Sequence, residues 1–150
     1  MKRPLVTIAC VIYNQEKYID EAIDGFLMQK VSFPYEILIH DDASTDRTAK
    51  IINEYARKYQ DIIKPLFQKD NQYSKGKKPF IDYVFPRAEG KYIALCEGDD
   101  YWTDPYKLQK QYDILEANSQ YPMCFHNAYV TYEGKSKGKK EFCPYKGHLE

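Results

Sequence analysis

The chain has 150 residues, a length that suits one domain with a substantial buried core. Lys and Arg together number 22, and so do Asp and Glu, so the formal net charge is zero. This balance argues against a nucleic-acid-binding protein, because such proteins carry an excess of basic side chains. Hydrophobic residues at 43% and aromatic residues at 15% exclude a disordered chain.

Hydrophobic patterning predicts strands and helices that alternate along the chain. Continuous apolar runs, typical of strands covered on both faces, predict strands over residues 5–12, 35–40, 62–68, 91–96 and 123–132. Apolar residues at helical spacing predict helices that begin after Asn14, after Ser44 or Thr45, over residues 80–88, and after Thr103. This alternation predicts an α/β fold with a mostly parallel sheet and helices on both faces.

The ends of the chain are expected to add little to this fold. The apolar run near the N-terminus leads directly into polar Tyr13–Lys17 without a small-residue cleavage site, so it is interpreted as a strand and not as a signal peptide. No stretch approaches the roughly 20 apolar residues of a transmembrane helix. Residues 133–150 are expected to form a tail to a single-domain core over about residues 4–132, and the final Leu149 and Glu150 resemble a cloning remnant.

Four cysteines indicate the compartment. The cysteines are Cys10, Cys96, Cys124 and Cys143. None of them has CxxC spacing, so they are interpreted as reduced thiols of a cytoplasmic protein.

The first candidate site is the acid pair Asp41 and Asp42, directly after the second predicted strand. Ligands of parallel α/β sheets bind beyond the carboxyl ends of the strands. A carboxylate there can accept a hydrogen bond from the imide of uracil or from a ribose hydroxyl, whereas the alternative role is to cap a turn. Tyr13, at the end of the first strand, either stacks on a base or packs on the sheet edge. His40 is interpreted as a core or edge histidine.

The second candidate site is an acidic turn, defined as Glu97, Gly98, Asp99 and Asp100, which follows the fourth predicted strand. Its carboxylates repel one another unless a cation is near, and Mg²⁺ and Mn²⁺ prefer carboxylate and phosphate oxygens. Gly98 would allow the backbone to approach a ligand closely. A solvated acidic turn is the alternative. However, the turn lies between a predicted buried strand and the aromatic Tyr101 and Trp102, so it is not on an obviously free surface, and this favours a metal–nucleotide site.

Three segments together resemble the family 2 glycosyltransferases, inverting enzymes of the GT-A fold. They lie at residues 6–14, 36–48 and 90–102 and read VTIACVIYN, EILIHDDASTDRT and GKYIALCEGDDYW. The likeness extends from about Pro4 to about Tyr132. It implies a Rossmann-like nucleotide-diphospho-sugar transferase fold, of which this chain is the N-terminal, donor-binding part.

The resemblance assigns the residues after the first two strands to the nucleotide base. Tyr13 matches the position that lines the base pocket in the family, with Val11 near it. Asp42 matches the acid that contacts uracil, with Asp41 beside it.

The resemblance assigns the acidic turn to the diphosphate and its metal. Glu97, Gly98 and Asp99 stand where the family has its DxD motif, with Glu97 in place of the first Asp. The longer Glu97 side chain could still accept a ribose hydroxyl. Asp99 would contact ribose or metal, and Asp99 or Asp100 would ligate the Mn²⁺ or Mg²⁺ ion that bridges the donor's diphosphate.

The implied reaction is metal-dependent transfer of a sugar, with inversion, from a nucleoside-diphosphate sugar to an acceptor hydroxyl. The donor is expected to be a UDP-sugar, and the acceptor a carbohydrate or lipid-linked sugar of polysaccharide or glycoconjugate biosynthesis. In the family the catalytic base comes from a later segment, and no motif before Glu150 supplies one. The alternative is an isolated nucleotide-sugar-binding module that is inactive alone. Full-length members often work at the cytoplasmic face of a membrane.

Other nucleotide and phosphate folds fit the motifs less well. A receiver-type phosphoacceptor domain would carry its acid pair after the first strand, where this chain has Tyr13 and Asn14. A Rossmann dehydrogenase needs GxGxxG, which the seven glycines do not form. A sugar nucleotidyltransferase would have a glycine-rich loop after the first strand.

Overall fold

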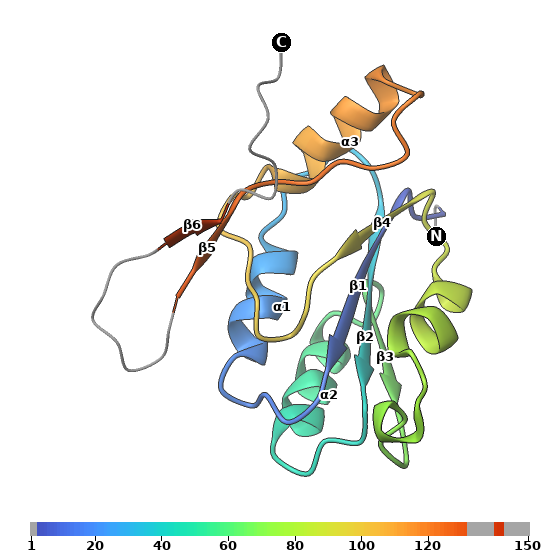
Figure 1. The fold of residues 1–150 in the computed structure, drawn as a ribbon, viewed down its shortest axis with the longest axis vertical. Helices are drawn as coiled ribbons and strands as arrows, with labels where there is room; N and C mark the ends of the chain where they lie inside the picture. The colour runs from blue at the N-terminus through green and yellow to red at the C-terminus, as the bar shows by residue number, and fades with distance from the viewer. Residues whose placement is uncertain (1–2, 132–139, 143–150) are drawn as a thin grey trace. The chain divides into compact units, whose positions relative to one another are not determined.

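The computed structural model describes residues 3–131 and 140–142 (Figure 1). The chain divides into two compact units, Met1–Lys110 and Gln111–Glu150. The first unit contains an open parallel sheet with helices, as the sequence predicts. Within the described residues, no helix is both long enough and apolar enough to cross a membrane.

The sheet of the first unit has four parallel strands in the order β3-β2-β1-β4. The strands are β1 (Val6–Ile12), β2 (Tyr35–Asp41), β3 (Ile63–Phe67) and β4 (Tyr92–Leu95). The chain passes from β1 to β2 and β3 in one direction and then returns to place β4 on the other side of β1. The strand order therefore reverses between β1 and β4, and open α/β sheets bind ligands at such a point.

Both faces of the sheet are covered. The helices α1 (Ile19–Leu27) and α2 (Thr48–Lys58) lie on one side, and the short turns η2 (Phe80–Val84) and η3 (Phe85–Arg87) lie on the other, as Figure 1 shows. On the η2 side, Ala9 of β1 and Leu38 of β2 pack with Val84. The other side chains of β1 and β2 are also buried because both faces of these strands are covered, except Val11 and Tyr35, which are partly exposed.

Helix starts differ from the predicted caps. Asn14 does not begin α1; it has a left-handed backbone with φ of 52°, and its side-chain oxygen accepts a 2.7 Å hydrogen bond from the N–H of Thr45. Neither Ser44 nor Thr45 is the N-cap of α2; that residue is Arg47, which makes no side-chain cap hydrogen bond. Asp46, just before it, accepts the N–H of Thr48 at 2.9 Å. Asp104 accepts the N–H two residues later and starts the turn that leads into α3 (Lys107–Ala117). Short polar side chains compete for such positions, so spacing alone misplaced them.

The predicted helix over residues 80–88 is two short turns. η2 is a single wide turn, and η3 is a tight turn that contains Pro86. Proline has no N–H to donate and clashes with the preceding turn, so a regular helix cannot continue through it. The break leaves Phe80 and Val84 against the sheet.

The second unit contains a two-stranded antiparallel sheet of β5 (Ala128–Val130) and β6 (Lys140–Phe142). The predicted fifth strand is therefore shorter than expected and does not join the parallel sheet. Strands joined by a short connection pair antiparallel, whereas a parallel pair needs a longer crossover. The predicted tail over 133–150 contains β6, and its other residues lie outside the described ones.

Candidate functional site

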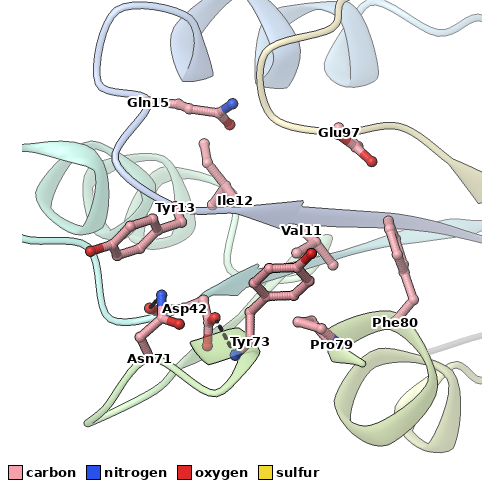
Figure 2. A pocket seen from close by; sticks show the side chains of 10 residues that line it. All are labelled: Val11, Ile12, Tyr13, Gln15, Asp42, Asn71, Tyr73, Pro79, Phe80 and Glu97. Atoms are coloured by element: carbon pink, nitrogen blue, oxygen red, sulfur yellow. Dashed lines mark hydrogen bonds between the residues drawn. The ribbon is translucent and has the colours of Figure 1, made fainter. Parts of the chain in front are cut away.

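A cleft of about 290 Å³ opens at the carboxyl ends of β1, β2 and β4 (Figure 2). It lies where the strand order reverses. Its lining residues are Val11, Ile12, Tyr13, Gln15, Asp42, Asn71, Tyr73, Pro79, Phe80 and Glu97. Four predicted site residues line it, namely Val11, Tyr13, Asp42 and Glu97, whereas Asp41, Asp99 and Asp100 are not among its lining residues.

Asp42 joins the sheet to one wall of the cleft. It is only 1% exposed, and its two carboxylate oxygens accept the N–H groups of Gln72 at 2.8 Å and Tyr73 at 2.9 Å. Its backbone carbonyl accepts a hydrogen bond from the Asn71 side chain at 3.2 Å. Figure 2 shows the contact between Asp42 and Tyr73. A carboxylate has about four acceptor positions, so these two hydrogen bonds leave further positions that could accept a hydrogen bond from a ligand.

The wall made by residues 71–73 is the part of the site that sequence reasoning missed. Asn71 and Tyr73 belong to a polar stretch that reads as an ordinary loop. The hydroxyl of Tyr83 on η2 supports this wall by donating a 2.8 Å hydrogen bond to the side-chain oxygen of Gln72. The sequence signal for this wall is weak, because it consists only of an acid at a strand end and an Asn-Gln-Tyr segment about 30 residues later. Only the fold shows that the two are in contact.

Asp41 takes the turn-capping role that the sequence left open for one of the two acids. It is buried, and its carboxylate accepts hydrogen bonds from the N–H and the hydroxyl of Ser44. Burial raises the pKa of Asp41, while the Ser44 hydrogen bonds oppose that rise. Between them, Ala43 adopts a left-handed backbone with φ of 64°.

The loops after β1 and β2 hold each other through reciprocal hydrogen bonds. Side chains of the DDASTDRT segment accept backbone N–H groups of residues 14–16, and side chains of that first loop accept N–H groups in return. The donor–acceptor pairs are Asn14 N–Ser44 Oγ (2.9 Å), Gln15 N–Thr48 Oγ1 (2.9 Å), Glu16 N–Asp46 Oδ2 (3.1 Å), Thr45 N–Asn14 Oδ1 (2.7 Å) and Arg47 N–Glu16 Oε2 (2.8 Å). This network holds Tyr13 and Asp42 at fixed places on the cleft.

The acidic turn presents exposed carboxylates beside the cleft. The N–H of Asp100 donates to the carbonyl of Glu97 at 3.2 Å and closes the turn. Partial burial raises the pKa of Glu97, and the negative charges of Asp99 and Asp100 raise it further. Partial burial and the charge of Asp99 also raise the pKa of Asp100. Mutual repulsion of this kind is relieved by a bound cation.

The donor set suits a metal that is shared with a ligand. The described residues contain no group of three or more His, Cys, Asp or Glu side chains arranged to hold an ion. Mg²⁺ commonly takes only one or two protein carboxylates and completes its shell with phosphate and water oxygens. The exposed carboxylates of Asp99 and Asp100 fit that pattern and do not form a complete protein cage.

Close packing fixes the acidic turn at both ends. The N–H of Gly98 donates to the carbonyl of Val11 at 3.2 Å, and a Cβ at this position would overlap the Ile12 side chain. The glycine is therefore required by packing against β1, whatever ligand approaches it. At the other end, the buried Trp102 ring packs edge-on against Phe26 of α1 with 5.0 Å between ring centroids.

The remaining predicted groups are structural. His40 is fully buried, and its ring stacks on that of Tyr83 with 5.3 Å between ring centroids; burial lowers its pKa. Cys10 and Cys96 are buried and free, and burial, with the Asp100 charge second, raises the pKa of Cys96 to about 12. Cys124 is also free, and Cys143 lies outside the described residues.

Comparisons with known proteins identify a matching family and several relatives of this chain. The profile described as "Glycosyl transferase family 2" matches residues 7–147. The uncharacterized protein Rv1520 of Mycobacterium tuberculosis is 46% identical over 139 residues, which are 93% of this chain and 39% of the relative. TuaG of Bacillus subtilis, provisionally named a teichuronic acid biosynthesis glycosyltransferase, is 32% identical over 78% of this chain and 44% of its own.

Among solved structures, TarS of S. aureus in complex with UDP-GlcNAc has the same fold. Its TM-score is 0.64 at 26% sequence identity, and the match covers 76% of this chain and 32% of TarS residues 1–349. The chain thus spans less than half the length of each of these relatives.

Proposed function

Because this chain belongs to glycosyl transferase family 2, we propose that it is the donor-binding part of an inverting, metal-dependent glycosyltransferase that uses a UDP-sugar. The observation that carries the proposal is the cleft at the point of strand reversal, which brings together Tyr13, Asp42 and Glu97. TarS, whose fold this chain shares, was solved with UDP-GlcNAc. That complex supports UDP as the nucleotide.

The base of the donor is proposed to lie between Tyr13 and the wall at residues 71–73. Tyr13 is 46% exposed and its ring offers an aromatic face for stacking, and Val11 lines the same cleft. Asp42 accepts the imide N–H of uracil with the acceptor capacity that Gln72 and Tyr73 leave unused. Asp41 acts indirectly, since its carboxylate holds the loop that follows Asp42.

The ribose and diphosphate are proposed to lie along the acidic turn. Glu97 lines the cleft and accepts a ribose hydroxyl, with Asp99 beside it. Asp99 and Asp100 would hold Mn²⁺ or Mg²⁺ together with the donor's phosphates. When bound, such a metal neutralises the charge that grows on the leaving diphosphate.

The reaction itself needs a group that the described residues do not assign. An acceptor hydroxyl attacks the anomeric carbon, the bond to the nucleoside diphosphate breaks, and a base takes the hydroxyl proton. We expect that base from polypeptide beyond Glu150, because the chain spans only 39% of the mycobacterial relative. The alternative is a binding module with no transfer activity of its own. The name of TuaG, which mentions teichuronic acid biosynthesis, supports a role in polysaccharide biosynthesis. We further propose that the full-length protein works at the cytoplasmic face of a membrane.

Calorimetric titration with UDP, with and without Mn²⁺, tests the donor site. Wild type should bind UDP at least about 10-fold more tightly with Mn²⁺, and Asp100→Asn should lose that increment. Asp61→Asn, at an exposed acid after α2, serves as the matched control and should behave as wild type. Equal affinity with and without the metal would refute the metal site, and undetectable UDP binding would refute the donor site.

A transfer assay separates the enzyme from the binding module. Hydrolysis or transfer of a UDP-sugar is measured on the 150-residue chain and on the longer gene product. Activity only in the longer protein supports the proposed division of labour. UDP binding without transfer in either one favours the module.

A further inference from the structure

Tyr83 belongs to a chain of contacts that leads from the sheet to Asp42. Its hydroxyl donates a 2.8 Å hydrogen bond to the side-chain oxygen of Gln72, whose backbone N–H donates to Asp42 Oδ1 at 2.8 Å. The ring of Tyr83 stacks on that of His40, with 5.3 Å between ring centroids. His40 and Asp42 are two residues apart, and side chains with this spacing along a strand lie on one face of the sheet. The contacts therefore begin and end on the same face of β2 and the residue that follows it.

This chain of contacts is held at each step. The Gln72 amide is bound at both ends, since its Nε2 donates to the carbonyl of Asp70 at 2.8 Å while its oxygen accepts from Tyr83. The turn η2, which carries Tyr83, is anchored on the sheet by the buried Val84. The two oxygens of Asp42 accept the N–H groups of residues 72 and 73, so the position of this wall sets the plane of the carboxylate.

We propose that Tyr83 is a positioning residue that acts through Gln72 to hold the Asp42 carboxylate in the orientation that selects uracil over cytosine. The inference rests on the proposed function. Uracil presents its imide N–H to the carboxylate, whereas cytosine has a ring nitrogen at that position that only accepts hydrogen bonds. Two acceptors repel each other, and a carboxylate that is held in place cannot turn away to relieve the repulsion. The hydrogen bond from Tyr83 therefore contributes to discrimination between bases and not only to stability.

Comparison of UDP with CDP in calorimetric titrations tests this role, because the two nucleotides differ only in the base. Wild type should bind UDP at least about 10-fold more tightly than CDP. Tyr83→Phe removes the hydroxyl and keeps the ring that stacks on His40. It should lower the UDP-to-CDP affinity ratio at least about 3-fold, by weakening the binding of UDP.

Tyr55→Phe is the matched control. The hydroxyl of Tyr55 on α2 also donates one side-chain hydrogen bond, to Asp24 of α1 at 2.9 Å. Neither residue lines the cleft. Tyr55→Phe should therefore keep the wild-type affinity ratio, and melting curves confirm that both variants are folded at the temperature of the titration.

Amide hydrogen exchange in the absence of nucleotide tests the positioning separately from the donor site. The amides of Gln72 and Tyr73, which donate to Asp42, should exchange at least about 5-fold faster in Tyr83→Phe than in wild type. In Tyr55→Phe they should exchange at the wild-type rate.

A double-mutant cycle tests the route through Gln72. Gln72→Leu removes the acceptor of the Tyr83 hydrogen bond and keeps the backbone N–H that donates to Asp42. If Tyr83 acts through this side chain, adding Tyr83→Phe to Gln72→Leu should not lower the UDP-to-CDP ratio further.

Three results would overturn the proposal. The first is a UDP-to-CDP ratio that Tyr83→Phe leaves unchanged, whether the two affinities stay the same or fall together. The second is full additivity of Tyr83→Phe and Gln72→Leu. The third is a wild-type chain that binds UDP no better than CDP, which would also refute the base assignment in the proposed function. In that third case faster exchange at Gln72 and Tyr73 would leave Tyr83 with a structural role alone.

Discussion

Replacement of Asp42 by alanine should damage both stability and nucleotide binding. The carboxylate accepts two backbone hydrogen bonds, from Gln72 and Tyr73, and hydrogen bonds to charged groups contribute about 1.5–3 kcal/mol each. Both hydrogen bonds are only partly buried, so water can replace part of what the substitution removes. We therefore expect the free energy of unfolding to fall by about 3 kcal/mol, which is the lower end of the range for two such hydrogen bonds.

Asp41→Ala is the matched control, because the two acids are adjacent and both are buried. Asp41 holds Ser44 and is absent from the lining of the cleft. Both variants should lose stability, but only Asp42→Ala should weaken UDP binding strongly, by roughly 10- to 100-fold for one charge-assisted hydrogen bond. Asp41→Ala should stay within about 3-fold of wild type.

Urea unfolding followed by the fluorescence of the single tryptophan, Trp102, gives the stability, and calorimetry gives the UDP affinity. Measurement of affinity at a temperature where both variants are folded removes the stability contribution. Equal UDP affinities for Asp41→Ala and Asp42→Ala would refute the assignment of the base to Asp42. Wild-type stability of Asp42→Ala would refute its role in holding the wall at residues 71–73.

Three further predictions concern the cleft and the sheet. Tyr13→Ala should weaken UDP binding by roughly 5- to 15-fold while Tyr13→Phe retains it, since stacking needs only the ring; calorimetry on both variants decides this. Gly98→Ala should lower the free energy of unfolding by about 1–3 kcal/mol, measured by urea titration, because its methyl group overlaps Ile12. Burial raises the pKa of Glu36, but hydrogen bonds from Lys64, Thr7 and Glu89 outweigh it and hold the pKa below its usual 4.5. This stabilisation is present above pH 4.5 and lost as the pH falls through the native pKa, so Glu36→Gln should flatten the pH dependence of unfolding below pH 4.5; identical curves for the two proteins would contradict this.

Glu36 also illustrates what a strand pattern conceals. It reads as a polar start to a buried strand, yet its carboxylate accepts the hydroxyl of Thr7 at 2.7 Å and the N–H of Glu89 at 2.8 Å. Lys64 of β3, whose side chain is partly exposed, places its ammonium group 2.7 Å from the other oxygen of Glu36. The Glu36 carboxylate of β2 thus contacts residues of β1 and β3 and the residue before Gly90. No local pattern in the sequence predicts that meeting.

The sequence by itself determined the existence of the four parallel strands and the helices α1 and α2, because hydrophobic periodicity is a local property of the chain. It also determined that Tyr13, Asp42 and Glu97 follow strands whose carboxyl ends share one edge. Only the tertiary structure decided which loop groups satisfy each other. The hydrogen bond from Thr45 to the Asn14 side chain and the wall at residues 71–73 both depend on strand order and register. Those contacts join residues far apart in the chain, so their partners are chosen by the assembled sheet and not by neighbouring sequence.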